Sequence, residues 1–444
     1  MTRSIGIRRE DKSAWERRAP LVPADVAELV AAGYEVLVQP SDIRVFSDDE
    51  YREAGASVDE DLSSAGVILA VKEVPIPLLV PERTYLFFAH VIKGQEHNMP
   101  LLRRMLDLGI TLVDYERIAD ADGRRLVKFG RQAGQAGMVE TLHALGHRLA
   151  AEGIETPLAD VRQPFHYGSL EAVRQALSQV ASTIETGFRP PSDGPLVFAF
   201  TGRGSVTQGA WEVFERLPYE LIAPEDLPRR LADHDGLQRS LLAVRLEKRH
   251  LATPKDPDKE FEEAEYRAHP ERYRGRLHRL LPYFTALVNG IYWDEDFPRF
   301  VTRRAMREMW RRGDRKLRVI GDISCDIEGS VELTHEATQP DAPCYVYDPE
   351  SDSFHAGLDG PGVAIMAVDN LPCELPIDAS REFSVPLRGF VPALADADWS
   401  VPYGALSLPS ALRRAVITHR GELTPDYHYL ERHLELAGLG RVAT

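Results

Sequence analysis

Cysteine is scarce in this chain of 444 residues, which contains only Cys325, Cys344 and Cys373. These residues are widely spaced and odd in number, so they offer neither a disulfide framework nor a CxxC pair of metal ligands. Such sparse usage is typical of a reducing compartment. We therefore expect a cytoplasmic protein that binds no metal.

The sequence also lacks long apolar runs and an excess of positive charge. No uninterrupted apolar stretch approaches the roughly 18 residues that a membrane span requires, and the first residues contain no apolar signal-peptide core. The formal net charge is -16 and the sequence pI is about 5.4, whereas a nucleic-acid surface needs clustered Lys and Arg. We expect neither export, membrane insertion nor nucleic-acid binding.

The apolar residues follow a pattern of alternating strands and helices. Hydrophobic residues make up 43% of the chain, enough for a large core and for two or three domains. In the first third the pattern predicts strands at 35–39, 66–71, 85–89 and 110–114, and helices at 24–32 and 99–108. A second series of the same kind begins at 195–200 and runs past Asp369. Strands that are apolar on both faces and alternate with helices predict an α/β fold with parallel sheets.

A stretch rich in Gly and Ala at 129–137 precedes a helical pattern from Met138 to Ala151. Small residues permit backbone movement at the start of a helix, which predicts a hinge between domains. They equally permit close packing without any motion. The sequence leaves both interpretations open.

Ionisable residues stand at three successive strand ends of the first domain. Lys72 follows the second predicted strand, His90 the third and Glu116 the fourth. Ligands of open α/β sheets bind beyond the carboxyl ends of the strands, so these side chains are a candidate proton-transfer set. Taken singly, each is as well explained by a strand that meets water or by a structurally satisfied histidine.

Cations are concentrated near the start of this acidic chain, at 8–20. Because the arginine guanidinium matches a carboxylate in shape, such a cluster indicates a site for a small organic acid. A solvated, charged N-terminus explains the same residues.

A glycine-rich segment at 201–210 lies between a predicted strand and a helical run at 211–216. A dinucleotide pyrophosphate binds at such a place, against backbone N–H groups at a helix N-terminus. However, four residues instead of two separate the second and third glycines, so a plain strand-turn-helix is a rival interpretation. The next predicted strand, 219–222, is followed by Glu225 and Asp226, and the absence of an acid at its very end leaves NAD or NADP open.

Two further features are expected to carry no chemistry. His143 and His147 are four residues apart, but the Glu that follows the first His of a zincin motif is absent, which favours ordinary helix positions. The span 245–279 carries charges of both signs and is predicted to be a solvated helical insertion.

Motifs along nearly the whole chain resemble one known enzyme family. Those in the first domain are RRED at 8–11, WERRAPL at 15–21, VK at 71–72, FAHVIK at 88–93, DYE at 114–116 and AGQAGM at 133–138. Later ones are FTG at 200–202, HPERY at 269–273, NGIYW at 289–293, DIS at 322–324 and DNLP at 369–372. The chain closely resembles the lysine–2-oxoglutarate reductase domain of bifunctional aminoadipic semialdehyde synthase. It is less similar to fungal lysine-forming saccharopine dehydrogenase and to alanine dehydrogenase.

The resemblance implies an enzyme that condenses the ε-amine of lysine with the keto group of 2-oxoglutarate. The imine would then be reduced by a nicotinamide hydride to saccharopine. Lys72 and His90 would form an acid/base pair for making and dehydrating the carbinolamine, and Glu116 would hold Lys72 by an ion pair. The residues implied to bind the substrate are Arg18, Lys93, Arg125 and Phe129.

The resemblance also implies two Rossmann-like domains with an interdomain cleft. Residues 1–136 plus 370–444 would form the substrate domain, and residues 137–369 would form the dinucleotide-binding domain with the charged insertion near 245–280. The implied cofactor-binding residues are Gly202, Arg203, Gly204, Ser205, Glu225, Asn289 and Asp322. Because the insertion matches the bifunctional enzymes, NADP(H) is the expected cofactor and NAD(H) the alternative.

One departure from the family concerns the end of the chain. The bifunctional enzyme continues into a saccharopine-oxidising half, whereas this sequence ends at Thr444 after an unfamiliar segment from Trp399. We expect it to pass saccharopine to a separate enzyme or to reduce a related imine. Two rival functions are another dehydrogenase of the superfamily, such as one acting on alanine and pyruvate, and a non-catalytic dinucleotide-sensing module.

Overall fold

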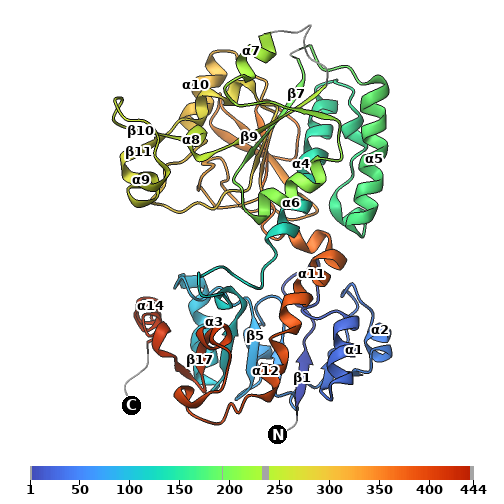
Figure 1. Cartoon of the computed structure of the whole chain (residues 1–444), viewed down its shortest axis with the longest axis vertical. Helices are drawn as coiled ribbons and strands as arrows, with labels where there is room; N and C mark the ends of the chain where they lie inside the picture. The colour runs from blue at the N-terminus through green and yellow to red at the C-terminus, as the bar shows by residue number, and fades with distance from the viewer. Residues whose placement is uncertain (1–2, 193, 233–239, 441–444) are drawn as a thin grey trace. The chain divides into compact units, whose positions relative to one another are not determined.

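The chain divides into two compact units in the computed structural model, which describes residues 3–192, 194–232 and 240–440 (Figure 1). Unit 1 comprises Met1–Phe129 and Pro376–Thr444, and unit 2 comprises Gly130–Leu375. The chain thus leaves unit 1 after Phe129 and returns to it at Pro376, a few residues from the boundaries predicted from the sequence.

Unit 1 is built on an eight-stranded sheet in the order β18-β17-β6-β5-β4-β1-β2-β3. The strands are β1 Ser4–Ile7, β2 Glu35–Val38, β3 Ser57–Val58, β4 Val67–Leu69, β5 Thr84–Phe87, β6 Thr111–Asp114, β17 Val416–His419 and β18 Glu422–Leu423. β1 to β6 pair in parallel, β17 pairs antiparallel with β6, and β18 pairs antiparallel with β17. The predicted parallel sheet is therefore confirmed for this unit. β17, which belongs to the unfamiliar C-terminal segment, is one of its strands.

The helices of unit 1 pack on this sheet through a single apolar core. They are α1 Pro23–Ala31, α2 Asp48–Glu53, α3 Met99–Asp107, α11 Pro376–Arg388, α12 Val391–Asp396, α13 Ser410–Arg414 and α14 Leu430–Leu436. α2 begins with a capping box, in which the Ser47 hydroxyl accepts from the Glu50 amide and the Glu50 carboxylate accepts from the Ser47 amide. Sequence and structure agree on α1 and α3 to within one residue at each end.

Unit 2 has its own eight-stranded sheet in the order β15-β14-β16-β13-β12-β7-β9-β8. The strands are β7 Leu196–Thr201, β8 Tyr219–Leu221, β9 Leu241–Leu246, β12 Ala286–Asn289, β13 Val319–Asp322, β14 Cys344–Asp348, β15 Ser353–Ala356 and β16 Val363–Met366. Side chains of β7 alternate between two apolar cores: Phe198 faces α4, α5 and α6, and Val197 faces α7, α8 and α10. The sheet is thus covered by helices on both faces, as the predicted α/β class requires.

The longer helices of unit 2 are α4 Gly130–Ala151, α5 Leu170–Gly187, α6 Ser205–Phe214 and α10 Arg303–Arg311, and the shorter ones are α7 Leu227–Ala232, α8 Lys248–Leu251 and α9 Glu263–Ala268. None of the helices within the described ranges is long and apolar enough to span a membrane.

The order of the strands next to β7 corrects one expectation. β7 pairs with β9 along its whole length, and β8, the next strand in the chain, pairs only with β9 at the edge of the sheet. The sequence analysis looked for an acid at the end of β8, the next strand along the chain. Instead the carboxyl end beside β7 is that of β9, and Glu247 follows it directly.

The glycine-rich stretch before Met138 lies inside a helix, so the predicted helix start is wrong. α4 begins at Gly130 and packs closely on α6. A Cβ atom at Gly134 would lie 1.8 Å from the carbonyl oxygen of Val206, and one at Gly209 would lie 2.0 Å from that of Arg131. Glycine lowers intrinsic helix propensity, but here it allows the two backbones to touch. Of the two interpretations left open, this geometry supports close packing.

We expect Gly134→Ala to destabilise the protein by about 3 kcal/mol, because the added methyl group meets backbone atoms that cannot rotate away. The matched control is Gly187→Ala at the end of α5, where a Cβ atom would have no neighbour within 4 Å. That substitution should stabilise by about 0.5 kcal/mol, since alanine loses less conformational entropy. Denaturant unfolding of both variants measures the difference, and equal stabilities would contradict the packing argument.

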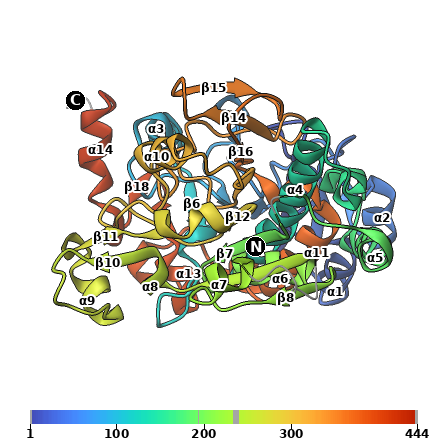
Figure 2. The same cartoon turned by 90° about the horizontal axis from the view of Figure 1, so that it is seen from above.

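The charged span 245–279 is not the helical insertion that was predicted. After β9 it contains α8, the antiparallel pair β10 Ala252–Pro254 and β11 Tyr273–Gly275, and α9, which lie together at one side of unit 2 in both views (Figures 1 and 2). A small aromatic core of Tyr266 and Tyr273, with Phe261 and Phe297 packed against it, holds these pieces together. The few apolar residues that define this subdomain are scattered among charged residues, so the sequence pattern did not reveal them.

Candidate functional site

Lys72 lies three residues after the end of β4, at the edge of the sheet where the parallel strands of unit 1 have their carboxyl ends. The β1 ladder ends when the Arg8 amide donates to the Leu69 carbonyl. Beyond this point the Glu10 carboxylate replaces the strand as hydrogen-bond acceptor: it accepts from the Val71 amide at 2.6 Å and from the Lys72 amide at 3.0 Å. Glu10 is buried, whereas Lys72 is half-buried at the sheet edge.

His90 and Glu116 follow the two neighbouring strands, β5 and β6, and their side chains meet. The His90 Nδ1 atom lies 3.7 Å from a Glu116 oxygen, and its Nε2 atom lies 3.8 Å from a Glu73 oxygen. His90 has a backbone φ of 54°, which is uncommon outside glycine and costs free energy. A ring held between two carboxylates on a strained backbone is typical of a functional histidine.

The two carboxylates beside His90 are ionised more readily than usual. Burial raises the pKa of Glu116, but its interaction with His90 and the positive charge of Arg125 outweigh burial, so the net pKa is lowered. Burial likewise raises the pKa of Glu73, and a 2.8 Å hydrogen bond from Lys12 together with His90 brings it below the ordinary value. Both groups are therefore acceptors for the imidazole. An ion pair between Glu116 and Lys72 stays a prediction.

Two buried carboxyl groups beneath this cluster are perturbed in the opposite direction. Burial and the charge of Glu16 raise the pKa of Glu10 to about 7, against the amides that bond it. Burial and the charge of Glu116 raise the pKa of Asp114 to about 7. Neither residue was singled out from the sequence, where each is one acid among many.

Arg18 is buried rather than open to solvent. Its Nε and one Nη atom donate to the two oxygens of Glu16 at 2.7 and 2.6 Å, and its guanidinium lies 4.2 Å from the centre of the Phe129 ring. Phe129 in turn stacks on Phe383 at 4.2 Å. One edge of the guanidinium is thus already bonded within the protein, and Glu16 is a partner that sequence reasoning missed.

The two other cations predicted to meet substrate are exposed. Arg125 lies 3.3 Å from Glu116 with about half of its side chain accessible (47%), and the charge of Lys93 also acts on Glu116. The structure therefore brings Glu116 together with His90 and Arg125, and Lys93 is near enough for its charge to act on the Glu116 carboxylate.

The predicted dinucleotide segment in unit 2 has the backbone that close approach of a ligand requires. Gly202 has φ of +83°, and a Cβ atom there would lie 3.1 Å from the Gly290 carbonyl oxygen and 3.2 Å from the Ile291 Cα. Gly204 is the N-cap of α6 and offers no side chain to the helix amides. α6 begins at Ser205, six residues before the helical run that was predicted, so the glycine loop is shorter and tighter than expected.

Two cavities adjoin this loop and share Gly202, Arg203, Leu246 and Glu247. One measures about 730 Å³ and extends along α6 to Trp211 and Arg245. The other measures about 490 Å³ and is lined in addition by Ile291 and by residues of the insertion: Lys248, Arg249, Phe261, Glu263 and Arg267. The insertion, which was expected to carry no chemistry, therefore forms a wall of the candidate site.

Glu247 follows β9, the strand beside β7, where an acid would reach the ribose of a dinucleotide, whereas Glu225 follows the edge strand β8. Glu247 forms an ion pair with Arg203 of the glycine loop and accepts from Arg249 at 3.0 Å. Glu225 follows the edge strand β8 and instead bonds His250 at 3.0 Å, in a separate hollow. The sequence clue was present, since Glu247 follows the apolar run of β9, but the run was not recognised as a strand.

Asn289 and Asp322 stand at the ends of β12 and β13 and are fully buried. The Asn289 amide donates at 2.9 Å to Asp322, Ser324 and Ser330, and Thr201 donates to its oxygen. Asp322 also accepts from Ser324 and Thr334. Burial raises the pKa of Asp322 despite these bonds. The network joins three strand ends, so these two residues are placed to hold the loops in position.

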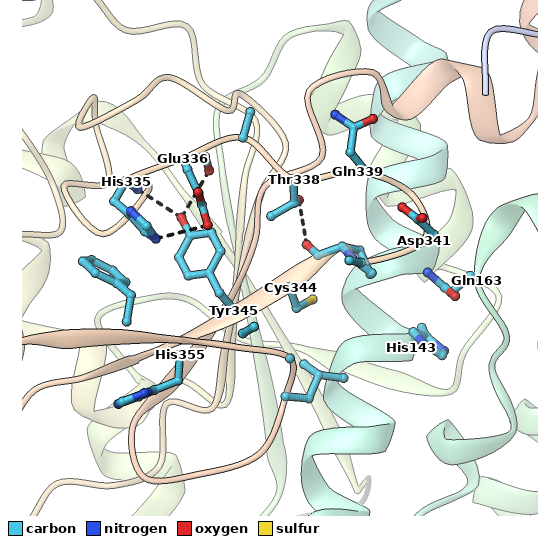
Figure 3. Close-up of a pocket in the computed structure, with 17 residues that line it drawn as sticks. His143, Gln163, His335, Glu336, Thr338, Gln339, Asp341, Cys344, Tyr345 and His355 are labelled. Atoms are coloured by element: carbon cyan, nitrogen blue, oxygen red, sulfur yellow. Dashed lines mark hydrogen bonds and ion pairs between the residues drawn. The ribbon is translucent and has the colours of Figure 1, made fainter. Parts of the chain in front are cut away.

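A further cavity of about 680 Å³ in unit 2 belongs to no predicted site (Figure 3). His143, His335 and His355 line it from separate elements, and His143 is committed through its Nδ1 atom to the Val161 carbonyl at 2.8 Å. Burial lowers the pKa of His143. Across the described ranges no three His, Cys, Asp or Glu residues are grouped so as to hold a metal ion.

Solved structures with the same arrangement of elements define the class of fold. An L-alanine dehydrogenase aligns over 98% of this chain and 99% of its own with a TM-score of 0.62 at 17% identity. A transhydrogenase from Sinorhizobium meliloti aligns over 95% and 100% with a TM-score of 0.58 at 16% identity. Residues 6–136 match the family described as alanine dehydrogenase/PNT, N-terminal domain. The chain thus has the two Rossmann-like domains of that class.

Sequence relatives are more specific and confirm the expected resemblance. Alpha-aminoadipic semialdehyde synthase of Arabidopsis thaliana is 37% identical over 96% of this chain, and the mitochondrial protein of that name from Mus musculus is 38% identical over 96%. The chain spans 41% and 47% of those two proteins. A saccharopine dehydrogenase (NAD(+), L-lysine-forming) of Neurospora crassa is 27% identical over 85% of this chain and 87% of its own. A cytoplasmic location stays a prediction.

Proposed function

We propose that this protein is a lysine–2-oxoglutarate reductase, which condenses lysine with 2-oxoglutarate and reduces the imine to saccharopine. The observation that carries the proposal is the 37–38% identity with aminoadipic semialdehyde synthases over 96% of the chain. The residue types at the strand ends of unit 1 support the same chemistry. Unit 1 would be the substrate domain and unit 2 the dinucleotide domain.

Imine formation requires protons to be moved on and off nitrogen and oxygen, and Lys72 and His90 are suited to this work. The amine adds to the keto carbon, a proton is supplied to the carbinolamine oxygen, and water leaves. Glu73 and Glu116, whose oxygens lie 3.8 and 3.7 Å from the two ring nitrogens, would orient the imidazole. A bound nicotinamide dinucleotide would supply the hydride that reduces the imine carbon.

Arg18, which pairs with Glu16, would meet a substrate carboxylate. Arg125 and Lys93, which stand near Glu116, would serve the other carboxylates of a saccharopine-like product. Bidentate contacts of this kind fix the orientation of the reacting carbon, which supplies much of the rate.

We propose NADP(H) as the cofactor, bound against the backbone of 202–205. Around the 490 Å³ cavity, Arg203 and Arg249 share Glu247, while Lys248 and Arg267 share Glu263. Four cations face two carboxylates, and the surplus positive charge would attract a 2′-phosphate. Glu247 by itself favours a ribose hydroxyl, which keeps NAD(H) as the alternative.

Oxidation of NADPH and NADH by the purified protein tests this proposal with a panel of amines against 2-oxoglutarate and pyruvate. We expect oxidation only when lysine and 2-oxoglutarate are both present, with kcat/KM at least about tenfold higher for NADPH, equivalent to ~1.4 kcal/mol. Oxidation with ammonia and a keto acid would instead indicate another dehydrogenase of the superfamily. Cofactor binding that no pair accelerates into turnover would indicate a sensing module.

A further inference from the structure

Two buried carboxylates hold the main chain beneath the residues assigned to proton transfer. Glu10 accepts from the amides of Val71 and Lys72, as described above. Asp114, at the end of β6, accepts from the Ala89 amide at 3.3 Å and from the Glu116 amide at 2.8 Å. The same arrangement therefore occurs twice, once at the strand end that bears Lys72 and once at those that bear His90 and Glu116.

Each carboxylate stands where an ordinary ladder bond is missing. The Val71 carbonyl accepts a hydrogen bond from the Phe88 amide of the neighbouring strand segment. The Val71 amide has no strand partner, because β1 has diverged at this point. The Glu10 carboxylate accepts its hydrogen bond instead. Asp114 plays the same part at the other strand end. The last paired residues of β5 and β6 are Phe87 and Asp114, so Ala89 lies beyond the ladder, directly before His90 with its positive φ. Both segments thus depend on a side chain for a bond that secondary structure does not supply.

We propose that Glu10 and Asp114 are positioning residues, which fix the backbones of Lys72, His90 and Glu116 so that their side chains converge on one reacting centre. The inference rests on the proposed function for what those three side chains do, but not for the hydrogen bonds themselves. An ionised carboxylate accepts two N–H groups at once, whereas a carboxamide offers one acceptor and presents its NH₂ group to the second donor.

Glu10→Gln and Asp114→Asn are therefore nearly isosteric tests. We expect each to lower kcat with lysine and 2-oxoglutarate by at least about tenfold, since a displacement of the order of 1 Å at a reacting group is costly. KM values should change by less than about threefold, because neither residue meets substrate. Asp25→Asn is the matched control: Asp25 is a buried carboxylate of unit 1 that binds Ser384 and Arg388, and its loss should affect stability but leave kcat within about twofold.

The pH profile separates positioning from a general structural role. Glu10 faces Glu16, Arg8 and Tyr115, and Asp114 faces Glu116, His90, Tyr115, Arg117 and Tyr427. The raised pKa of each carboxyl, about 7, means that its acceptor capacity falls as the pH drops below neutrality. The wild-type protein and Asp25→Asn should lose kcat over that range, and the two amide variants should show a flatter acidic limb.

Hydrogen exchange measures the bonds without reference to any activity. In Glu10→Gln the amides of Val71 and Lys72 should exchange at least about tenfold faster, and in Asp114→Asn so should those of Ala89 and Glu116. If the wild-type protein turned over no substrate pair, the proposed function would fail while exchange still tested the positioning. Unchanged exchange at these amides, or wild-type kcat and pH profile in both variants, would overturn the inference.

Discussion

Lys72→Met and His90→Gln are each expected to lower kcat by roughly 10²- to 10⁴-fold, the usual contribution of a positioned acid or base. Both substitutions remove a titrating nitrogen and keep a side chain of similar size. Both lie in unit 1, whereas the glycine loop and the two cavities that adjoin it lie in unit 2. Dinucleotide affinity should therefore stay within about twofold, because neither residue lines those cavities.

Steady-state oxidation of NADPH in the presence of lysine and 2-oxoglutarate gives kcat, and quenching of protein fluorescence by NADPH gives the affinity. His428→Gln is a suitable control, because His428 is an exposed histidine of the same unit whose ring contacts the Leu423 carbonyl. Turnover close to that of the wild type in both Lys72→Met and His90→Gln would remove these residues from proton transfer. A loss of cofactor affinity as large as the loss of turnover would point to misfolding instead.

Local apolar patterns were sufficient to predict four of the eight strands of unit 1, β2, β4, β5 and β6, and the fold class. They failed where an apolar run directly adjoins charged residues or where an element depends on partners far away in the chain. β1 is four residues long and directly precedes the cationic segment, yet it stands in the middle of the sheet between β4 and β2. β17 reaches the sheet from the C-terminal segment and pairs with β6, which no periodicity could reveal.

The candidate proton-transfer residues were predictable because parallel strands place their carboxyl ends along one edge. Glu247 was not, because the pairing of β9 with β7 passes over the intervening strand β8. Glu10 and Asp114 were missed for a different reason. Their role depends on the backbone amides that donate hydrogen bonds to their carboxylates. The residue type alone does not reveal those partners.

A second large effect is expected from the Glu140–Glu374 pair in unit 2, which should make the protein more stable at pH 5 than at pH 8. Both side chains are at most 1% exposed, and the charge of Glu140 acts on Glu374. The Gln163 amide donates to Glu140 at 3.4 Å, the charges of both carboxylates act on the thiol of Cys344, and no cation is among the groups that shift the pKa of either glutamate. Two buried anions side by side would be costly, so the pair must retain a proton.

The sign follows from the direction of the shifts. Burial raises the pKa of Glu140 from 4.5 to about 7, and burial together with Glu140 raises that of Glu374 further. The folded state therefore binds more protons than the unfolded chain. The stabilisation is complete below the unfolded pKa and is lost as the pH rises towards and through 7, with a loss of about 3 kcal/mol for the Glu140 shift alone.

Replacing one member by its amide removes one of the two ionisable groups and offers the other an N–H donor. We expect Glu140→Gln to be more stable than the wild type by about 2 kcal/mol at pH 8 and nearly equal at pH 5, which corresponds to roughly 4–8 °C in Tm. Glu152→Gln, directly after the end of α4, is the matched control, because Glu152 pairs with Arg148 and Arg318. It should destabilise at pH 8, since an ion pair is lost. Thermal unfolding at both pH values decides between them, and a Glu140→Gln variant less stable than the wild type at pH 8 would show that the carboxyl pair is not the source of the pH dependence.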